Sequence, residues 1–307
     1  MDKFESIRAF AQVVDSGGFA AAARVMGLSR SAVNKLVMNL EDDLKVQLLH
    51  RTTRKVTPTE TGLAFYDRCL AILADLAEAE QAASQLQTEP KGRLRINAPM
   101  TFGTLHLAPA VADFLTQYPD LQIELALSDR FIDPIEEGFD LTVRIAVPPD
   151  SASLIVHRLV TANRVMCASP AYLERHGIPQ HPNDLKQQSC LHYGYLSSQN
   201  QWRLTGPGGE IYPVTVQGVL CSNNGEVLRD AALKGLGIIL VPTFIVGQDL
   251  KQGTLQAILA DYPPVEIAVY VLYPVNRHLS TKVQLLTEFL SDRFGGCPDW
   301  DLGIENL

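Results

Sequence analysis

Residues 19–58 read FAAAARVMGLSRSAVNKLVMNLEDDLKVQLLHRTTRKVTP, and this stretch decides the fold of the N-terminal part of the chain. It predicts a short alanine-rich helix, a turn at Gly27 and Leu28, a second helix and a basic, β-prone tail. The apolar residues of the second helix recur at i, i+3, i+4 and i+7, so they share one face that must pack against a core. They are Val33, Leu36, Val37 and Leu40. Ser29 stands where the N-cap of this helix belongs.

The opposite face of the second helix carries hydroxyl, amide and cationic groups, which hydrogen-bond to base edges and phosphates of DNA. The predicted contacts there are Ser29, Arg30, Ser31, Asn34 and Lys35, and those in the basic tail are Arg51, Thr52, Arg54 and Lys55. From residue 24 to residue 58 there are seven Lys or Arg and three Asp or Glu, a charge of +4 in a chain of −8. A confined positive patch on an acidic chain indicates a DNA-binding module.

Taken alone, residues 19–40 also fit an ordinary pair of helices with a solvated polar face. Residues 1–16 add a helical stripe that we expect to form the third wall of a trihelical core. The stripe consists of Phe4, Ile7, Ala11 and Val14. Together with the basic tail, it favours the DNA-binding interpretation.

The segments AAARVMGLSRSAVN (21–34) and LEDDLKVQLLHRTTRKVTPTETG (40–62) resemble the hallmark of the LysR-type transcriptional regulators, a winged helix-turn-helix family. The resemblance implies binding to a double-stranded DNA operator. Four positions depart from the family pattern. Arg30 and Asn34 should alter base preference, and Leu49 should alter core packing. Ala20 stands where a Ser or Thr often caps the second helix, a loss of about 1 kcal/mol.

Composition bounds the class of protein. With 307 residues we expect two or three domains, and 46% apolar residues suffice for a sizeable core. No stretch reaches the roughly 18 apolar residues of a membrane span, and the first residues do not resemble a signal peptide. We therefore expect a cytoplasmic protein that does not contact a membrane.

Five cysteines show neither C-x-x-C nor metal-like spacing, so we expect reduced thiols, no metal and no cofactor. The sequence leaves open an alternative in which Cys190 and Cys221 form a redox switch, as in some relatives of the family. Cys190 and Cys221 have only His192 nearby to lower a thiol pKa.

Residues 59–89 predict one long helix with apolar residues spaced 4-3-4-3-4-3. The seam consists of Phe65, Cys69, Ile72, Leu76, Ala79, Ala83 and Leu86. We expect it to pair with a second copy, since a two-fold dimer places two recognition helices on successive half-sites. Packing of the seam on its own domain is the alternative. The resemblance implies a linker helix through which such regulators form dimers or dimers of dimers.

From residue 90 onward, strand-like and helix-like segments alternate, which predicts an α/β fold with a mostly parallel sheet. We expect a helix over residues 102–118, a short helix in FIDPIEEG (131–138), a helix over 279–294 and a solvated tail over 295–307. The motifs RLRI-x-AP-x-x-FG, LSDR, EGFDL and RHLS resemble a large proteobacterial subgroup of the family. This resemblance implies a two-lobed, periplasmic-binding-protein-like (type 2) effector domain over 90–307. Lobe I would comprise about 92–163 and 266–294, and lobe II about 164–265.

Ligands of open α/β sheets bind beyond the carboxyl ends of strands, beside helix N-termini. The predicted effector contacts, chosen for this placement and partly by the resemblance, are Met100, Thr101, Phe102, Ser128, Arg144, Tyr193 and Asn223. Hydroxyls, helix N-termini and an arginine favour a small anion, most simply a carboxylate. Two alternatives stay open: Arg144 pairs structurally with Asp129 or Asp140, or Asn223 belongs only to a turn.

These features predict a winged helix-turn-helix over 1–58, a dimerising linker over 59–89 and an effector domain over 90–307. The function expected is a transcriptional regulator whose operator binding responds to a small molecule. Its partners would be DNA, the effector and a second copy, with RNA polymerase as a further candidate. An enzyme is not expected, because no G-x-S-x-G, Walker loop or H-E-x-x-H is present. A solute-binding protein would lack the basic N-terminal domain.

Overall fold

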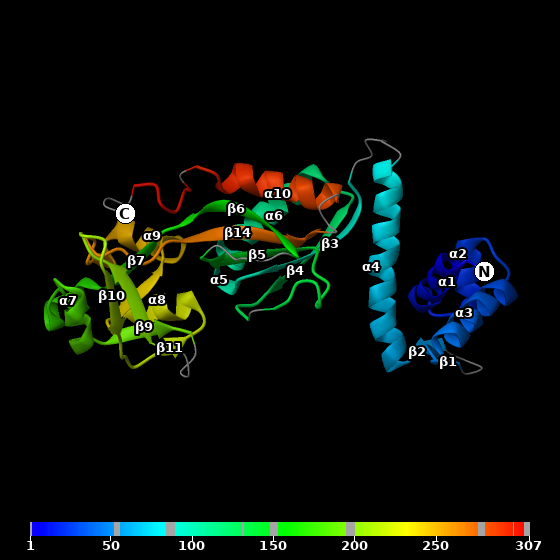
Figure 1. The fold of residues 1–307 in the computed structure, drawn as a ribbon, viewed down its shortest axis with the longest axis horizontal. Helices are drawn as coiled ribbons and strands as arrows, with labels where there is room; N and C mark the ends of the chain where they lie inside the picture. The colour runs from blue at the N-terminus through cyan, green and yellow to red at the C-terminus, as the bar shows by residue number, and fades with distance from the viewer. Residues whose placement is uncertain are drawn as a thin grey trace. The chain divides into compact units, whose positions relative to one another are not determined.

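Two units make up the computed structural model, Met1–Thr88 (unit 1) and Glu89–Leu307 (unit 2), and each has a hydrophobic core of its own (Figure 1). The structure describes residues 2–51, 56–83, 90–130, 132–147, 153–194, 200–275, 280–296 and 298–303. Within these ranges every helix is too short or too polar to cross a membrane.

Unit 1 is a trihelical domain with a small wing and a long fourth helix (Figure 1). Its elements are α1 (Lys3–Asp15), α2 (Phe19–Met26), α3 (Arg30–Leu44), β1 (Leu49–Arg51), β2 (Val56–Pro58) and α4 (Glu60–Ala83). Helix α2 ends at Gly27, whose φ of 66° is the left-handed value that glycine adopts without strain. Helix α3 begins as predicted, because the Ser29 hydroxyl accepts a hydrogen bond from the Ala32 N–H at 3.1 Å.

The cap expected for α2 was misplaced. Ala20 lies inside the helix, and the N-cap is Gly18, which makes no side-chain capping hydrogen bond. The position that lacks a capping side chain is therefore Gly18. The next residue, Phe19, begins the helix, and its side chain is buried in the core. A Ser or Thr side chain at position 20 would not cap this helix.

The predicted core stripe of α3 is confirmed: all four of its apolar residues are buried. The stripe of α1 is partly wrong, because Phe4 is 43% exposed. The buried face of α1 is centred on Phe10 instead, with Ile7 and Val13 one turn to either side. Phe10 lies three residues from both Ile7 and Val13, so it shares their face of the helix, and its side chain is fully buried.

The first part of the α4 seam packs within unit 1. The Phe65 ring lies 5.8 Å from the Phe10 ring, and Cys69 is fully buried in the same core. Their assignment to a dimer interface is therefore wrong, because the seam begins where α4 covers α1. Ile72 is 43% exposed, and Leu76 is half-buried. The side chains of Ala79 and Ala83, and Leu86 as a whole, lie outside the described residues.

Unit 2 contains two five-stranded sheets, one in each lobe (Figure 1). Lobe I has the order β4 (Leu121–Leu127), β3 (Gly92–Ala98), β5 (Leu141–Ala146), β14 (Ile267–Pro274) and β6 (Leu154–Ala162). Lobe II has the order β11 (Cys221–Ser222), β8 (Cys190–Tyr193), β12 (Ile238–Pro242), β7 (Arg164–Ala168) and β13 (Gln256–Ile258). The hairpin of β9 (Gln201–Thr205) and β10 (Ile211–Thr215) packs in lobe II.

The expectation of a mostly parallel sheet is wrong, because each sheet is mixed. In lobe I, β3 pairs in parallel with β4 and β5, whereas β14 is antiparallel to both β5 and β6. The reason is the path of the chain. Strand β6 leads out of lobe I, and Asn163 separates it from β7; strand β14 then brings the chain back beside β6 in the opposite direction.

The helices of unit 2 cover these sheets. In lobe I they are α5 (Met100–Phe102), the π-helix η1 (Gly103–Leu107), α6 (Ala108–Gln117) and α10 (Thr281–Phe294). In lobe II they are α7 (Pro170–His176), the 3₁₀-helix η2 (Pro182–Gln187), α8 (Gly225–Leu233) and α9 (Thr243–Gln252). The run predicted to begin at Phe102 begins at Met100 and includes a π-helical turn.

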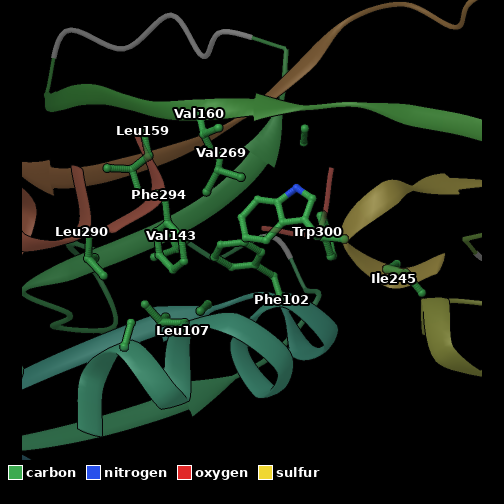
Figure 2. Packing of buried hydrophobic residues seen from close by; sticks show 14 of the residues in the cluster. Phe102, Leu107, Val143, Leu159, Val160, Ile245, Val269, Leu290, Phe294 and Trp300 are labelled. Atoms are coloured by element: carbon green, nitrogen blue, oxygen red, sulfur yellow. The ribbon is translucent and has the colours of Figure 1, made fainter. Parts of the chain in front are cut away.

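Two further expectations for unit 2 are wrong. Residues 134–138 form turns rather than a short helix, although the Asp133 carboxylate accepts the N–H groups of Ile135 and Glu136 as a helix cap would. Part of the described C-terminal tail is not solvated. Trp300 and Asp301 are each only 9% exposed, and the Trp300 indole packs beside Phe102 in the core of unit 2 (Figure 2).

Candidate functional sites

The exposed face of α3 displays cationic groups. Arg30 and Lys35 are exposed, and within the described part of the chain neither has an ion pair or hydrogen-bond partner. Ser31 is also exposed, and its hydroxyl lies 3.0 Å from that of Ser29. Ser29 acts first as the helix cap, which orients the first turn and the side chains that follow it.

Arg51 lies on β1 of the wing, and its side chain contacts other residues of unit 1. Its guanidinium pairs with the Glu41 carboxylate, donates to the Asn34 Oδ1 at 2.9 Å and lies over the Phe19 ring at 5.3 Å. Asn34 is half-buried under this contact. Arg51 thus connects α3 to the wing in the free protein. Thr52, Arg54 and Lys55 lie outside the described residues.

The sequence analysis did not predict a structural role for Glu41. One of its carboxylate oxygens accepts the N–H groups of Leu48 at 2.8 Å and Leu49 at 3.0 Å, and the other pairs with Arg51. Its side chain is only 11% exposed. The signal in the sequence was an acidic residue inside a basic segment. Such a residue lowers the net charge of the segment, and it can also form an ion pair that fixes the position of a nearby arginine.

A cleft of about 920 Å³ lies between the lobes of unit 2. Five of the predicted effector contacts line it together: Thr101, Phe102, Ser128, Arg144 and Tyr193. Met100 and Asn223 are not among the lining residues. Asn223 is exposed, and its neighbour Asn224 caps α8 by accepting the N–H groups of Glu226 and Val227. The structure therefore does not place Asn223 among the residues that line the cleft, and its neighbour Asn224 serves as a helix cap.

Asp129 occupies the helix N-terminus that the sequence argument assigned to a ligand. Its carboxylate accepts the Met100 N–H at 3.1 Å and a hydrogen bond from the Tyr193 side chain, so it joins lobe I to lobe II across the cleft. Burial raises the pKa of Asp129, while these hydrogen bonds and the nearby Arg144 charge lower it. The cleft therefore contains a carboxyl group of its own.

Arg144 projects into the cleft from β5. Its Nη1 donates to the Asn97 Oδ1 at 2.6 Å and to the Val143 carbonyl at 2.9 Å, whereas its Nη2 is buried without a hydrogen-bond partner. Burial lowers the pKa of Arg144, and the charges of Asp129 and Glu137 oppose that shift. Of the two structural partners considered, Asp129 is the one whose charge acts on Arg144.

Arg164 also lines the cleft, and it was not among the effector contacts predicted from the sequence. It follows Asn163 at the crossing between the lobes, and its Nη2 donates to the Val265 carbonyl. Its Nε is buried without a hydrogen-bond partner, and burial alone lowers its pKa. The signal available in the sequence was an arginine directly at the predicted lobe boundary.

The remaining cleft wall is largely apolar and aromatic. Phe102 and Phe244 meet edge to face with ring centroids 5.3 Å apart, and Trp202 closes another side. The Thr142 hydroxyl in this wall is also buried without a hydrogen-bond partner. A cleft with buried cationic N–H groups and aromatic walls is suited to a small anion that has an apolar body.

The strand register argues against a disulfide between Cys190 and Cys221. In the pairing of β8 with β11, Cys221 lies opposite His192, two residues beyond Cys190. That offset separates the two Cα atoms by about 8 Å, and disulfides need Cα atoms within about 7 Å. Burial also raises the pKa of the Cys190 thiol to about 12, which suppresses the reactive thiolate.

Comparison with known proteins covers both units. Residues 4–63 match the bacterial regulatory helix-turn-helix proteins of the lysR family, and residues 87–295 match the LysR substrate binding domain. A Haemophilus influenzae HTH-type transcriptional regulator is 39% identical over 283 residues, 92% of this chain and 98% of the relative. The Escherichia coli regulator DmlR is 35% identical over 293 residues, 94% of this chain and 93% of the relative. The solved structure of CrgA, a LysR-type transcriptional regulator from Neisseria meningitidis, matches with a TM-score of 0.62 and 31% identity over 95% of this chain and 99% of that chain.

Proposed function

The chain belongs to the LysR family of transcriptional regulators, and from that premise we propose that its effector is a small carboxylate bound in the cleft of unit 2 by Arg144 and Arg164. The observation that carries the proposal is that both guanidinium groups have a buried N–H without a hydrogen-bond partner in one cavity. A buried donor left unpaired destabilises a protein by about 1–3 kcal/mol. A ligand that supplies the missing acceptors removes that penalty.

Charge strengthens this reasoning at Arg164. Burial alone lowers its pKa, so no carboxylate within the described residues offsets the loss of hydration. A carboxylate suits this position because the planar guanidinium binds it through two parallel hydrogen bonds. Phe102, Trp202 and Phe244 would then pack against the apolar part of the same ligand. Asp129 adds selectivity, because it repels a second negative charge near the Met100 end of the cleft.

A thermal-shift experiment on the full-length protein tests the ligand class. Benzoate, phenylacetate and isobutyrate are compared with their uncharged amides, which keep the shape and remove the charge. At about 100 times its dissociation constant, a ligand stabilises the folded state by about 2.7 kcal/mol, a shift of a few degrees. We expect a shift with at least one acid and none with its amide. Equal shifts with acid and amide would contradict the anion site.

Variants connect such a shift to the cleft. Arg164→Gln should abolish the response, because glutamine retains a donor for the Val265 carbonyl but loses the charge. Arg158→Gln is the matched control, since Arg158 is an exposed arginine on β6, pairs with Glu266 and does not line the cleft. If both variants respond like the parent, the anion does not bind at Arg164.

We further propose that two copies bind one operator, each with α3 in a major groove, and that the copies pair through the distal part of α4. In support, Arg30 and Lys35 are exposed on the capped helix, and Ile72 is 43% exposed on α4. Sedimentation of Ile72→Glu checks the pairing. A shift toward monomer is expected, because an ionised side chain resists burial in an interface. Unchanged association would exclude Ile72 from it.

DNA binding is tested by mobility shift on the operator. Lys35→Ala should weaken binding to all sequences, whereas Arg30→Ala should change base preference by about 1–3 kcal/mol per lost base contact. Lys186→Ala removes one exposed charge from lobe II and controls for net charge. An effect of Lys186→Ala equal to that of Lys35→Ala would contradict a specific role for α3.

A further inference from the structure

The C-terminal tail crosses from one lobe to the other. It follows α10, which belongs to lobe I, and Phe294 at the end of that helix lies 5.8 Å from the Trp300 indole. The Asp299 carbonyl then accepts a hydrogen bond from the Lys251 ammonium group on α9 of lobe II at 3.1 Å. Few residues therefore connect the last helix of one lobe to a helix of the other.

Trp300 packs against aromatic rings from both lobes. In lobe I its ring centroid lies 4.5 Å from that of His106 and 6.1 Å from that of Phe102. In lobe II it lies 6.2 Å from that of Phe244. Figure 2 shows the indole beside the Phe102 ring, with Ile245 of α9 farther along the same core.

The contacts of Trp300 reach the cleft indirectly. Phe102 and Phe244 line the cleft, whereas Trp300 does not, so the indole supports the aromatic wall from behind. His106 reinforces the junction, because its Nε2 lies 3.0 Å from the Phe244 carbonyl oxygen and joins the two lobes directly. The Trp300 ring covers this histidine and limits its access to water.

Asp301 ties the tail to the point where the chain changes lobe. Its Oδ2 accepts a hydrogen bond from the Asn163 Nδ2 at 2.9 Å, and Asn163 is the residue between β6 and β7. The Asn163 carbonyl also accepts the Thr243 N–H at the start of α9. Within residues 299–301 the tail thus contacts lobe I, lobe II and Asn163, the residue that connects them.

We propose that residues 298–303 form a clamp that sets the angle between the lobes and positions Phe102 and Phe244 in the effector cleft. The match to the family's substrate-binding domain ends at residue 295, so the clamp lies outside that domain model. Because rings of both lobes pack against the Trp300 indole, a movement of one lobe relative to the other must break some of these contacts. The clamp therefore opposes lobe opening, and Trp300 is a positioning residue for the cleft.

Hydrogen–deuterium exchange of the ligand-free, full-length protein tests the clamp. Trp300→Ala should accelerate exchange by about tenfold or more in two segments, 100–107 of lobe I and 243–252 of lobe II, because loss of a buried indole leaves a cavity between them. Strand β3 serves as the internal reference and should keep the parent rate. Equal acceleration in β3 would mean that Trp300 stabilises unit 2 as a whole, and this result would overturn the clamp.

Matched variants sharpen the test. Leu302→Ala changes a tail residue that is 52% exposed and should leave both segments unchanged. Trp300→Phe should keep most of the protection, because the indole Nε1 has no hydrogen-bond partner to lose. If Trp300→Ala does not fold, Asp301→Ala replaces it and should accelerate exchange in 243–252. Parent-like exchange in whichever of these two variants is measured would overturn the proposal.

The effect on ligand response rests on the proposed function, whereas the exchange experiment does not. Benzoate is the probe for the response: Trp300→Ala should weaken its binding by about tenfold, while Leu302→Ala should not. Parent-like binding by Trp300→Ala would contradict the positioning role. If benzoate and the other acids fail to bind the parent protein, the carboxylate proposal fails, and exchange in the ligand-free protein still decides the clamp.

Discussion

Helix α3 and the cleft of unit 2 present similar cations under opposite conditions. Arg30 and Lys35 are exposed on α3, where water and salt screen their charges. Arg144 and Arg164 each have a buried N–H without a hydrogen-bond partner. An exposed cation attracts any polyanion from a distance at little cost in hydration. A buried one has already lost part of its hydration, so it favours the ligand whose acceptors fit.

The difference teaches how one chain separates two kinds of recognition. The free cations of α3 suit a long polyanion whose phosphates repeat along a duplex, and Glu41 and Arg51 hold the helix in place for it. The cleft suits one small molecule, because its unpaired donors are few and enclosed.

Ionic strength should separate the two surfaces most strongly. Between about 50 and 200 mM salt, operator affinity of the dimer should fall about a thousandfold, because bound phosphates displace condensed counterions. Carboxylate affinity in the cleft should change by less than about tenfold, because buried pairs are screened weakly. Fluorescence anisotropy on DNA and calorimetry with the carboxylate measure both. Equal salt slopes would remove the distinction between the surfaces.

Removing the anchor of α3 should have the next largest effect. Glu41→Ala leaves the Leu48 and Leu49 N–H groups and the Arg51 guanidinium without their acceptor. We expect unit 1 to lose about 2–3 kcal/mol of stability in urea unfolding. Asp42→Ala changes an exposed neighbouring acid and should stay within about 0.5 kcal/mol of the parent. Equal losses in the two variants would contradict the anchoring role.

A single hydroxyl in the cleft should contribute less. Thr101 lines the cleft, and Thr101→Val removes its hydroxyl at nearly constant shape. Carboxylate affinity should fall by about 1 kcal/mol, the typical value of one neutral hydrogen bond. Calorimetry measures the change, and Thr116→Val, an exposed position on α6, is the control. An unaffected Thr101→Val would exclude that hydroxyl from the ligand shell.

The smallest effect should be a dependence of unit 2 stability on pH. Burial lowers the pKa of His106 below the ordinary value of about 6.5. The unfolded chain then binds protons first as the pH falls, so stability declines from about pH 6.5 downward until the folded pKa is passed. His106→Gln should flatten this decline in thermal melts, whereas His157→Gln, at an exposed histidine, should not. An unchanged slope in His106→Gln would contradict the assignment.

Local patterns accounted for much of the fold. The i, i+3, i+4, i+7 stripe of α3 and its Ser29 cap follow from short stretches, because helix periodicity and capping are local properties. The errors occur where distant segments meet. Phe65 and Cys69 continue a dimer-like seam in sequence, yet Cys69 is buried in the unit 1 core and Phe65 packs against Phe10 of α1.

The cleft shows the same division. Thr101, Ser128 and Arg144 were found because each follows or lies on a strand whose carboxyl end faces the cleft. Arg164 was missed because its loss of hydration depends on packing from both lobes. The hydrogen bond from the Met100 N–H, at the start of α5, to the Asp129 carboxylate could not be predicted either, since it depends on how two loops approach one another.

Periodicity, capping and local charge predicted a basic helix-turn-helix with a β-prone tail, a long helix and an α/β region, whereas the two lobes were implied by the family resemblance. Only the tertiary structure decided which polar groups lose water and which find partners. Arg51 and Arg30 look equivalent in sequence, but Arg51 is paired with Glu41, whereas Arg30 is exposed and has no partner among the described residues. Trp300 in an acidic tail looks solvated, but it is buried between two lobes. Burial and pairing arise from contacts between remote segments, and short-range patterns do not encode them.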